Sequence, residues 1–275
     1  MTGIGLPSDI RDRLQADTLT LRYDQRTISS DLSVSIPDGA FTVIVGPNAC
    51  GKSTLLKALS RLSRPSDGQV ILDGRDIHGM AAKDVARRLG LLPQSAIAPD
   101  GITVADLVAR GRYPHQSFLR QWSSADEAAV EKAMAATGVT DLSGRPVDEL
   151  SGGQRQRVWV AMVLAQETPI LLLDEPTTFL DIAHQIELLD LLSDLNDEGR
   201  TIVAVLHDLN HACRYASHLI AMKDGAIVAS GKPAEIVRAD LVETVFNLPA
   251  LVMSDPIMGT PMIVPRGRRS IGDKN

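Results

Sequence analysis

The chain has few cysteines and lacks any long hydrophobic run. Its two cysteines, Cys50 and Cys213, are too few for a disulfide framework and are typical of a reducing cytosol. No apolar stretch reaches the ~18–20 residues that a membrane span needs. The first twenty residues are charged where a signal peptide would have an apolar core. The sequence therefore predicts a soluble chain, so that any membrane role must come through a partner.

An excess of positive charge is also missing. The net charge is -6 over 275 residues, whereas a surface that neutralises nucleic-acid phosphates leaves a basic footprint. Apolar residues make up 44% and charged residues 23% of the chain, the ordinary balance of a globular protein. We find no internal repeat and no low-complexity tract. The composition therefore argues against a nucleic-acid partner.

Strand and helix patterns alternate along most of the chain, which is typical of an α/β fold. We expect antiparallel strands within 18–36 and further strands at 41–45, 70–72, 89–93, 170–174, 201–206 and 219–229. Helices are expected at 52–62, 154–166, 182–195, 209–215 and 233–239. From about 98 to 150 the patterns, at 103–110 and 124–137, are helical. They predict an inserted helical subdomain, and residues 248–275 give no clear pattern.

A glycine-rich loop follows the apolar segment 41–45. Residues 46–53 fit G-x-x-x-x-G-K-[ST] and precede a helical pattern, which makes a chance glycine turn a weak alternative. In such a loop backbone N–H groups surround phosphate oxygens, Lys52 reaches the β- and γ-phosphates, and the Ser53 hydroxyl holds Mg²⁺. The predicted nucleotide-binding residues are Gly46, Pro47, Asn48, Ala49, Cys50, Gly51, Lys52, Ser53 and Thr54. A guanine-reading Asn-Lys-x-Asp motif is absent, which favours ATP.

A second apolar segment, 170–174, ends in two carboxylates. Asp174 closes the expected strand and can orient Mg²⁺ beside Ser53. Glu175 points differently, because it is one residue further on, and can act as general base on an attacking water. An acidic loop after a strand would be the simpler interpretation if the phosphate loop were not present.

Tyr23 and His207 are weaker candidates from the residues alone. Tyr23 lies on an expected strand, where its ring could stack on adenine or simply be half-buried. His207 follows an apolar strand, at the edge where α/β sheets bind ligands, and could contact the γ-phosphate. It could instead form a metal site with Asp208 and His211.

A second glycine-rich loop stands between the two phosphate-site motifs. Ser151, Gly152, Gly153 and Gln154 follow Leu150 and open a helical pattern that is basic at its start. The serine hydroxyl, the glycine N–H groups and the helix N-terminus would together form an anion site. This loop has no evident use within its own subunit, and it therefore points to a partner.

With this loop in place, the chain resembles the ATP-binding cassette (ABC) ATPases over residues ~18–240. The resemblance implies that Tyr23 stacks on adenine and that Gly46 to Thr54 form the phosphate loop. It also implies that Ser53 and Asp174 hold Mg²⁺, that Gln94, at the junction with the helical subdomain, joins the catalytic and Mg²⁺-binding set, and that Glu175 is the catalytic base. Ser151 to Gln154 would form the signature motif, Leu180-Asp181 the D-loop, and His207 would be the switch histidine. Lys52 belongs to the catalytic set.

The resemblance also implies the architecture. A phosphate-loop NTPase core of mostly parallel sheet, with helices on both faces, would comprise 18–95 and 150–240 of one cassette domain spanning 1–275. An antiparallel β subdomain lies on its N-terminal side, a helical subdomain is inserted at about 96–149, and 241–275 is a C-terminal extension.

The same resemblance implies the partners and the mechanism. Two copies pair head to tail and hold each ATP between the phosphate loop of one and the signature motif of the other. Hydrolysis separates them, and Gln94 with the helical insertion relays the motion to two transmembrane permease subunits. The chain would then lie peripherally on the cytoplasmic face of the bacterial inner membrane. A periplasmic or lipid-anchored binding protein would deliver the cargo.

Four segments, at 108–116, 162–167, 175–178 and 206–216, resemble ATPases of bacterial ferric-siderophore importers. The Gly-Arg-Tyr-Pro element at 111–114 also occurs in relatives that serve vitamin B12 and haem, so these cargoes stay open alternatives. A soluble cassette ATPase is a further alternative, against which the single cassette and the acidic balance argue. The signature motif argues against a phosphate-loop kinase or GTPase.

Two positions depart from the family pattern. Ala49 stands where glycine is usual, and because alanine at positive φ would cost ~1 kcal/mol or more, we expect an ordinary backbone conformation there. Thr178-Phe179 replaces small residues before Leu180, which affects the inter-subunit contact.

Overall fold

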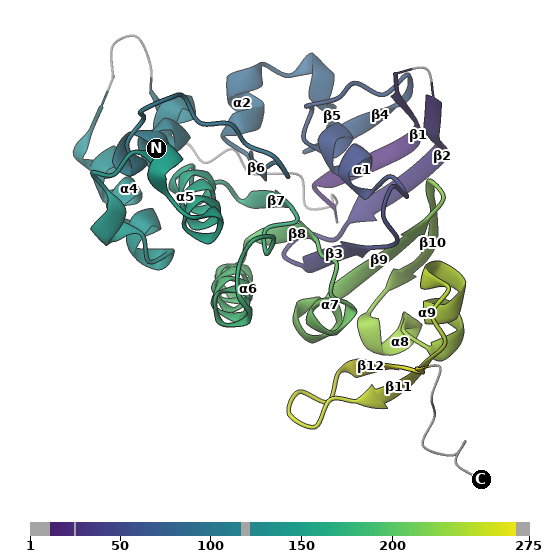
Figure 1. Cartoon of the computed structure of the whole chain (residues 1–275). Coiled ribbons are helices and arrows are strands. Elements are labelled where there is room, and N and C mark those ends of the chain that lie inside the picture. The colour runs from purple at the N-terminus through teal and green to yellow at the C-terminus, as the bar shows by residue number, and fades with distance from the viewer. Residues whose placement is uncertain (1–11, 25, 117–121, 268–275) are drawn as a thin grey trace. The chain divides into compact units, whose positions relative to one another are not determined.

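The computed structural model describes residues 12–24, 26–116 and 122–267 (Figure 1). The chain divides into two compact units. The first unit comprises Met1–Gly74 and Val205–Asn275, and the second unit comprises Arg75–Ala204. Strands and helices alternate in both, as the sequence predicts.

An antiparallel sheet occupies the N-terminal part of the first unit. Strand β1 (Leu14–Tyr23) pairs with β2 (Arg26–Ile36) on one side and with β4 (Asp67–Leu72) on the other. Leu14 lies opposite both Ile36 and Leu72, so that buried side chains of the three strands meet on one face. The predicted antiparallel strands are therefore confirmed, and they begin earlier than predicted, at Leu14.

A second group of strands in the first unit leads to the phosphate loop. Strand β3 (Phe41–Val45) is buried along its whole length and runs parallel to β9 (His218–Lys223), which pairs antiparallel with β10 (Ala226–Gly231). A continuous apolar run is typical of a strand covered on both faces. Helix α7 (Leu209–Tyr215) packs against β3, and helix α1 (Lys52–Leu59) packs against β1.

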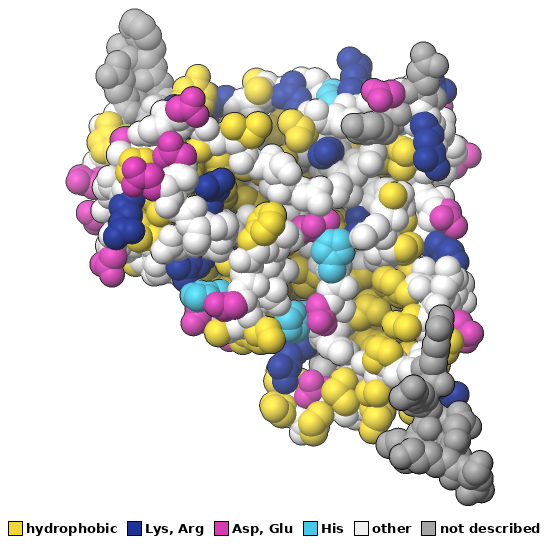
Figure 2. Space-filling view, in the orientation of Figure 1, with side chains coloured by type: hydrophobic (Ala, Val, Ile, Leu, Met, Phe, Trp, Pro, Cys, Tyr) yellow, Lys and Arg dark blue, Asp and Glu magenta, His cyan; other side chains and the backbone are white. Residues whose placement is uncertain are grey.

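The C-terminal part of the first unit differs from the prediction. The helix expected at 233–239 is wrong, because α8 (Pro233–Ile236) stops where residue 237 leaves helical geometry, and α9 (Ala239–Phe246) begins after an extended residue 238. A hairpin of β11 (Ala250–Ser254) and β12 (Pro261–Pro265) follows, in the stretch that gave no pattern. Figure 2 shows hydrophobic side chains gathered over this hairpin.

The second unit contains its own run of sheet. Strand β6 (Leu89–Leu92) is parallel to β7 (Ile170–Asp174), and β8 (Thr201–Val205) lies on the other side of β7. Strands β7 and β8 are buried throughout, as parallel strands covered on both faces are. Helices α2 (Ala82–Ala86) and α5 (Gly152–Ala165) pack against β6.

Helices and short 3-10 turns fill most of the rest of this unit. They are η1 (Ile77–Gly79) after the short strand β5 (Arg75–Asp76), α3 (Val104–Ala109), η2 (Arg110–His115), α4 (Ser124–Ala136), η3 (Thr140–Leu142), η4 (Val147–Glu149) and α6 (Ile182–Asp197). The helical character expected between 98 and 150 is confirmed, and the boundaries at 96 and 149 stay a prediction. Within the described ranges, no helix is both long and apolar enough to cross a membrane.

A buried arginine anchors the end of α5 that lies away from the signature motif. The Arg112 guanidinium donates to Asp126 (2.9 Å), to the Ala165 carbonyl (2.7 Å) and to Glu167 (2.7 Å). Asp126 also accepts from the Ser123 hydroxyl, and this bond together with Arg112 lowers the pKa of its carboxyl. The cluster joins η2, α4 and the C-terminal end of α5 by charge-assisted hydrogen bonds.

Candidate functional site

The phosphate loop has a backbone that glycine alone fits at its first position. Gly46 has a φ of 155°, and a Cβ built on it would lie 2.2 Å from the Met222 carbonyl oxygen. Gly51, which caps α1, has a φ of 105°. Both glycines are therefore required by geometry as well as by the motif.

Ala49 adopts a left-handed conformation with a φ of 62°. The expectation of an ordinary conformation at this position is wrong. The loop turns back between Pro47, whose carbonyl accepts from the Cys50 N–H at 3.4 Å, and Gly51. The turn fixes the backbone at residue 49, and alanine bears a strain of ~1 kcal/mol there that glycine would avoid.

Lys52 closes the loop on itself. Its side chain lies in the first turn of α1 and is almost fully buried, with the residue only 5% exposed. The ammonium group donates to the carbonyl oxygens of Gly46 and Pro47, each at 2.9 Å. The predicted phosphate ligand is thus held at the N-terminus of α1, where the helix dipole favours anions.

The β9–β10 turn supports the loop from outside the motif. The Gly225 N–H donates to the Cys50 carbonyl at 3.0 Å, and a Cβ on Gly225 would lie 1.8 Å from the Ile28 carbonyl oxygen. Cys50 is buried, and desolvation raises the pKa of its thiol, as expected of a packing residue. Gly225 was not among the predicted site residues, although Asp224-Gly225 is a turn signal.

His207 leaves the sheet beside the phosphate loop. The Leu206 N–H donates to the Ile44 carbonyl at 3.3 Å, so that His207 follows directly beside the end of β3. Its side chain is exposed. Asp208 accepts from the N–H groups of Asn210 and His211 and thereby caps α7. The described residues contain no cluster of three or more His, Cys, Asp or Glu that could hold a metal ion, so the alternative metal site receives no support.

Tyr23 is the last residue of β1. Its side chain is outside the part of the structure that is described, and the stacking role stays a prediction.

In the second unit, Gln94 and the acidic pair leave the sheet at one edge. Strands β6 and β7 are parallel, and Leu92 lies opposite Leu173. Asp174 therefore ends β7 beside the end of β6, and Gln94 follows β6 by two residues. Asp174 is only 1% exposed, and Glu175 has a φ of 56° and lies within 3.4 Å of the Thr178 hydroxyl. A strained backbone at a charged residue is frequent at functional sites.

The signature loop is an exposed, capped helix start. The Ser151 hydroxyl accepts from the Gln154 N–H (3.3 Å), and the Gln154 side chain accepts from the Ser151 N–H (3.1 Å). This capping box explains why α5 starts at Gly152, earlier than the predicted residue 154. Ser151 and Gly152 remain exposed, so that the serine, the glycine N–H groups and the helix dipole face outward.

Phe179 lies against the two signature glycines. A Cβ on Gly152 would be 3.3 Å from the Phe179 Cβ, and one on Gly153 would be 3.1 Å from the Phe179 carbonyl oxygen. The Phe179 ring is nevertheless largely exposed, at 74% for the residue. A cavity of about 360 Å³ is lined by Gln94, Gly152, Phe179 and their neighbours. The second unit thus brings the glutamine, the signature loop and the D-loop together.

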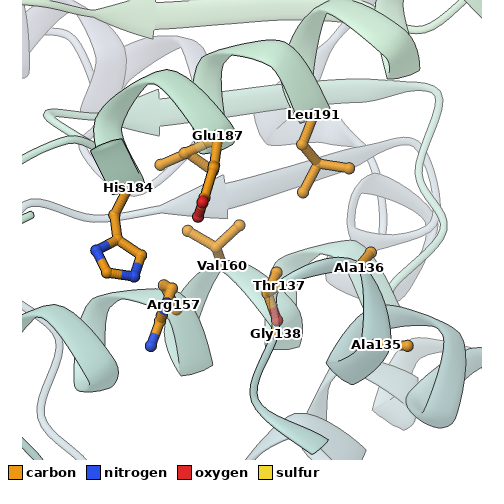
Figure 3. A pocket seen from close by; sticks show the side chains of 10 residues that line it. Ala135, Ala136, Thr137, Gly138, Arg157, Val160, His184, Glu187 and Leu191 are labelled. Atoms are coloured by element: carbon orange, nitrogen blue, oxygen red, sulfur yellow. The ribbon is translucent and has the colours of Figure 1, made fainter. Parts of the chain in front are cut away.

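A separate cavity of about 280 Å³ lies behind the signature helix (Figure 3). Its walls come from α6, with His184 and Glu187, from α5, with Arg157, and from the end of α4, with Ala135 and Ala136. The Arg157 Nε is buried and has no hydrogen-bond partner among the described residues. His184 is held by the Asp181 carboxylate at 2.8 Å. The signature helix α5 is therefore flanked by a pocket that it shares with α6.

The sequence profile of the ABC transporter family matches residues 29–178, which include the phosphate loop, Gln94, the signature motif and the acidic pair. The chain belongs to the ABC transporter family. It is accordingly a nucleotide-binding ATPase of the ABC type. It is 60% identical to the ferric enterobactin transport ATP-binding protein FepC of Escherichia coli (strain K12), over 96% of this chain and 97% of that protein.

Solved ABC structures share the fold. A structure described as an inward-facing metal-chelate type ABC transporter aligns with a TM-score of 0.78 and 27% identity, covering 94% of this chain and 98% of that one. The dimeric structure of a bacterial ABC transporter cassette aligns with a TM-score of 0.73 and 26% identity, over 80% of this chain and 98% of that one. The predicted α/β phosphate-loop fold is confirmed for this ABC ATPase.

Proposed function

We propose that this ABC ATPase is the energy-coupling subunit of an importer for ferric siderophores. The observation that carries the proposal is the 60% identity with FepC along nearly the whole of both chains. The likeness to a metal-chelate type transporter agrees with it. The ATPase would not touch the cargo, so its substrate assignment follows from the partners to which it couples.

In this proposal the first unit holds the nucleotide. Backbone N–H groups of the phosphate loop surround the phosphate oxygens, and Lys52 exchanges its carbonyl contacts at Gly46 and Pro47 for the β- and γ-phosphates. Tyr23 stacks on adenine. Because Lys52 is already buried at the mouth of the loop, its charge needs little rearrangement to meet the phosphates.

Magnesium fits the residues that would hold it. The Ser53 hydroxyl, the Gln94 amide and the Asp174 carboxylate supply hard oxygen ligands, the kind that Mg²⁺ prefers. The Asp174 side chain is buried at a strand end, where a carboxylate is favoured beside a cation. When bound, Mg²⁺ would neutralise charge on the phosphates.

Glu175 would accept a proton from the attacking water. The Thr178 hydroxyl donates to its carboxylate at 3.4 Å, and its left-handed backbone turns it away from the direction of Asp174. His207, at the start of α7, would contact the γ-phosphate and orient the same water. Neither side chain forms a covalent bond to the phosphate, so the residues act by positioning and by moving one proton.

The signature loop would complete the site of a second copy. Its serine and its first glycine are exposed at a helix N-terminus, which suits an anion brought from outside the chain. We therefore propose a homodimer with ATP at the interface, on the cytoplasmic face of the bacterial inner membrane. Two transmembrane permease subunits and, indirectly, a periplasmic or lipid-anchored siderophore-binding protein are the proposed partners.

The test is uptake in a strain that lacks the gene. Restoring the wild-type chain should restore accumulation of iron-labelled ferric enterobactin, and Glu175→Gln should not restore it although the protein is present in the membrane fraction. Ferric hydroxamate, haem and labelled cobalamin are the comparison cargoes. Restoration of cobalamin or haem uptake alone would contradict the siderophore assignment and leave the ATPase intact.

A further inference from the structure

The C-terminal hairpin is fixed to the helix that follows His207. The Asn210 side chain pairs with the backbone of Ile263 in both directions, because its amide nitrogen donates to the carbonyl at 3.3 Å and its oxygen accepts from the N–H at 2.7 Å. This is the pattern that a neighbouring strand would make, and here one side chain supplies it. Ile263 is buried where β12 packs against α7.

A second link holds the other ends of the same two elements. Arg214, in the last turn of α7, lies 3.4 Å from the Asp255 carboxylate. Asp255 also accepts from the N–H groups of Ile257 and Met258, which fixes the turn of the hairpin. These bonds, and then Arg214, lower the pKa of the Asp255 carboxyl. The hairpin is therefore rigid at its tip and attached to α7 at two points.

The start of α7 receives this support directly. Asp208 accepts from the Asn210 N–H at 2.8 Å, so Asn210 is tied to the helix cap through its backbone and to the hairpin through its side chain. His207 immediately precedes this cap. We infer that the hairpin β11–β12 sets the position of His207 through Asn210, which makes Asn210 a positioning residue for ATP hydrolysis. The inference rests on the proposed contact of His207 with the γ-phosphate.

The hairpin β11–β12 would then affect the rate of ATP hydrolysis through α7. A short helix of seven residues has little stability by itself, so its orientation depends on what packs against it. Removing the Asn210 amide should leave the phosphate loop unchanged and should loosen the 207–211 segment. We therefore expect a loss in kcat without a matching loss in ATP affinity.

The test compares Asn210→Ala with Asn196→Ala, whose side chain donates to the Arg200 carbonyl at the end of α6. Asn210→Ala removes both side-chain hydrogen bonds to Ile263 and should lower kcat by about five- to tenfold, with less than about a twofold change in ATP dissociation constant. Asn210→Asp keeps the oxygen that accepts from Ile263 and should recover part of kcat. Hydrogen exchange of the backbone at 207–211 should accelerate in Asn210→Ala and not in Asn196→Ala.

His207→Ala separates the possible failures. If it abolishes turnover while Asn210→Ala behaves like Asn196→Ala in kcat and in exchange, the hairpin inference is overturned and the proposed function stands. If His207→Ala retains wild-type kcat, the proposed role of His207 is wrong and the inference falls with it. An equal loss from Asn210→Ala in the wild-type and His207→Ala backgrounds would show a route that does not pass through His207, which also overturns the inference.

Discussion

The two glycine-rich loops of this chain use glycine for different reasons. In the phosphate loop, Gly46 is required by a positive φ and by a backbone carbonyl that would lie 2.2 Å from any Cβ. In the signature loop, Gly152 and Gly153 start an ordinary helix, and a Cβ there would meet Phe179 at 3.3 and 3.1 Å. The phosphate loop folds around its own Lys52, which is bonded to the loop carbonyls, whereas the signature loop exposes Ser151 and Gly152 at the surface.

The two loops also differ in how far their polar side chains are buried. Lys52 is buried and bonded to the loop it belongs to, whereas Ser151 is exposed and capped only by its neighbour in the helix. A ligand bound at the first loop meets a rigid cradle. A ligand at the second meets an outward-facing helix end. The difference suits one loop that holds ATP and another that arrives with a partner.

Gly46→Ala should have the largest effect. The new Cβ would overlap the Met222 carbonyl, and we expect about 3 kcal/mol or more of destabilisation together with loss of ATP binding. Gly152→Ala is the matched control, since alanine there gains helix propensity and its Cβ would lie 3.3 Å from the exposed Phe179 side chain, which needs to shift by only a few tenths of an ångström. Thermal unfolding and equilibrium ATP binding measure both. Equal melting temperatures for the two variants would refute the distinction between a closed and an open loop.

The second prediction concerns the two loops in a single dimer. Lys52→Ala and Ser151→Ala should each remove most ATP hydrolysis, because each would destroy both composite sites of the proposed homodimer. Mixing the two folded variants should recover up to one working site per dimer. ATPase assays over a range of mixing ratios measure the recovery. Complete failure to recover, with mixed dimers demonstrated, would contradict a site shared between subunits.

A smaller effect is expected from acid. The pKa of Asp126 is lowered by the Ser123 hydroxyl and by Arg112, so the stability it contributes is present above the unfolded-state pKa and is lost as pH falls through the folded-state value. We expect the wild type to lose unfolding free energy through this group as the pH falls below the usual pKa range of an aspartate. Asp126→Asn should have a lower unfolding free energy than the wild type at neutral pH, and its unfolding free energy should change less as the pH falls.

Urea unfolding across the acid range measures this loss. Asp181→Asn is the control, because the pKa of Asp181 is also lowered, mainly by the His184 N–H, but its side chain is exposed and screened by solvent. An acid profile for Asp126→Asn that parallels the wild type would show that the signature helix does not depend on this charge cluster.

Ala49→Gly should have the smallest effect, and it should be stabilising. Glycine relieves the left-handed strain at a φ of 62°, and part of that gain is offset by greater freedom in the unfolded chain, leaving up to about 1 kcal/mol. Chemical denaturation measures it, with ATP affinity as a second readout. Destabilisation instead would mean that the methyl group contributes packing to the loop.

Sequence patterns predicted the elements that carry motifs, because a buried strand, a phosphate loop and a helix are specified by neighbouring residues. They failed where the backbone conformation of a residue, or the pairing of a strand, depends on the folded structure around it. Ala49 gives no signal for positive φ, and the turn around it imposes one. The pairing of Leu92 with Leu173, which places Gln94 beside Asp174, joins strands far apart in sequence. The hairpin at 250–265 was missed because its strands are short and largely exposed, and because β12 begins and ends with proline.

The support that Gly225 gives to Cys50 has a practical consequence for protein engineering. The eight contiguous residues of the nucleotide motif do not by themselves determine the conformation of the loop. A graft of residues 46–53 onto another scaffold would need a β-turn from a remote strand pair, with a glycine pressed against the Ile28 carbonyl. Without that turn the transplanted loop would keep its consensus and lose its shape.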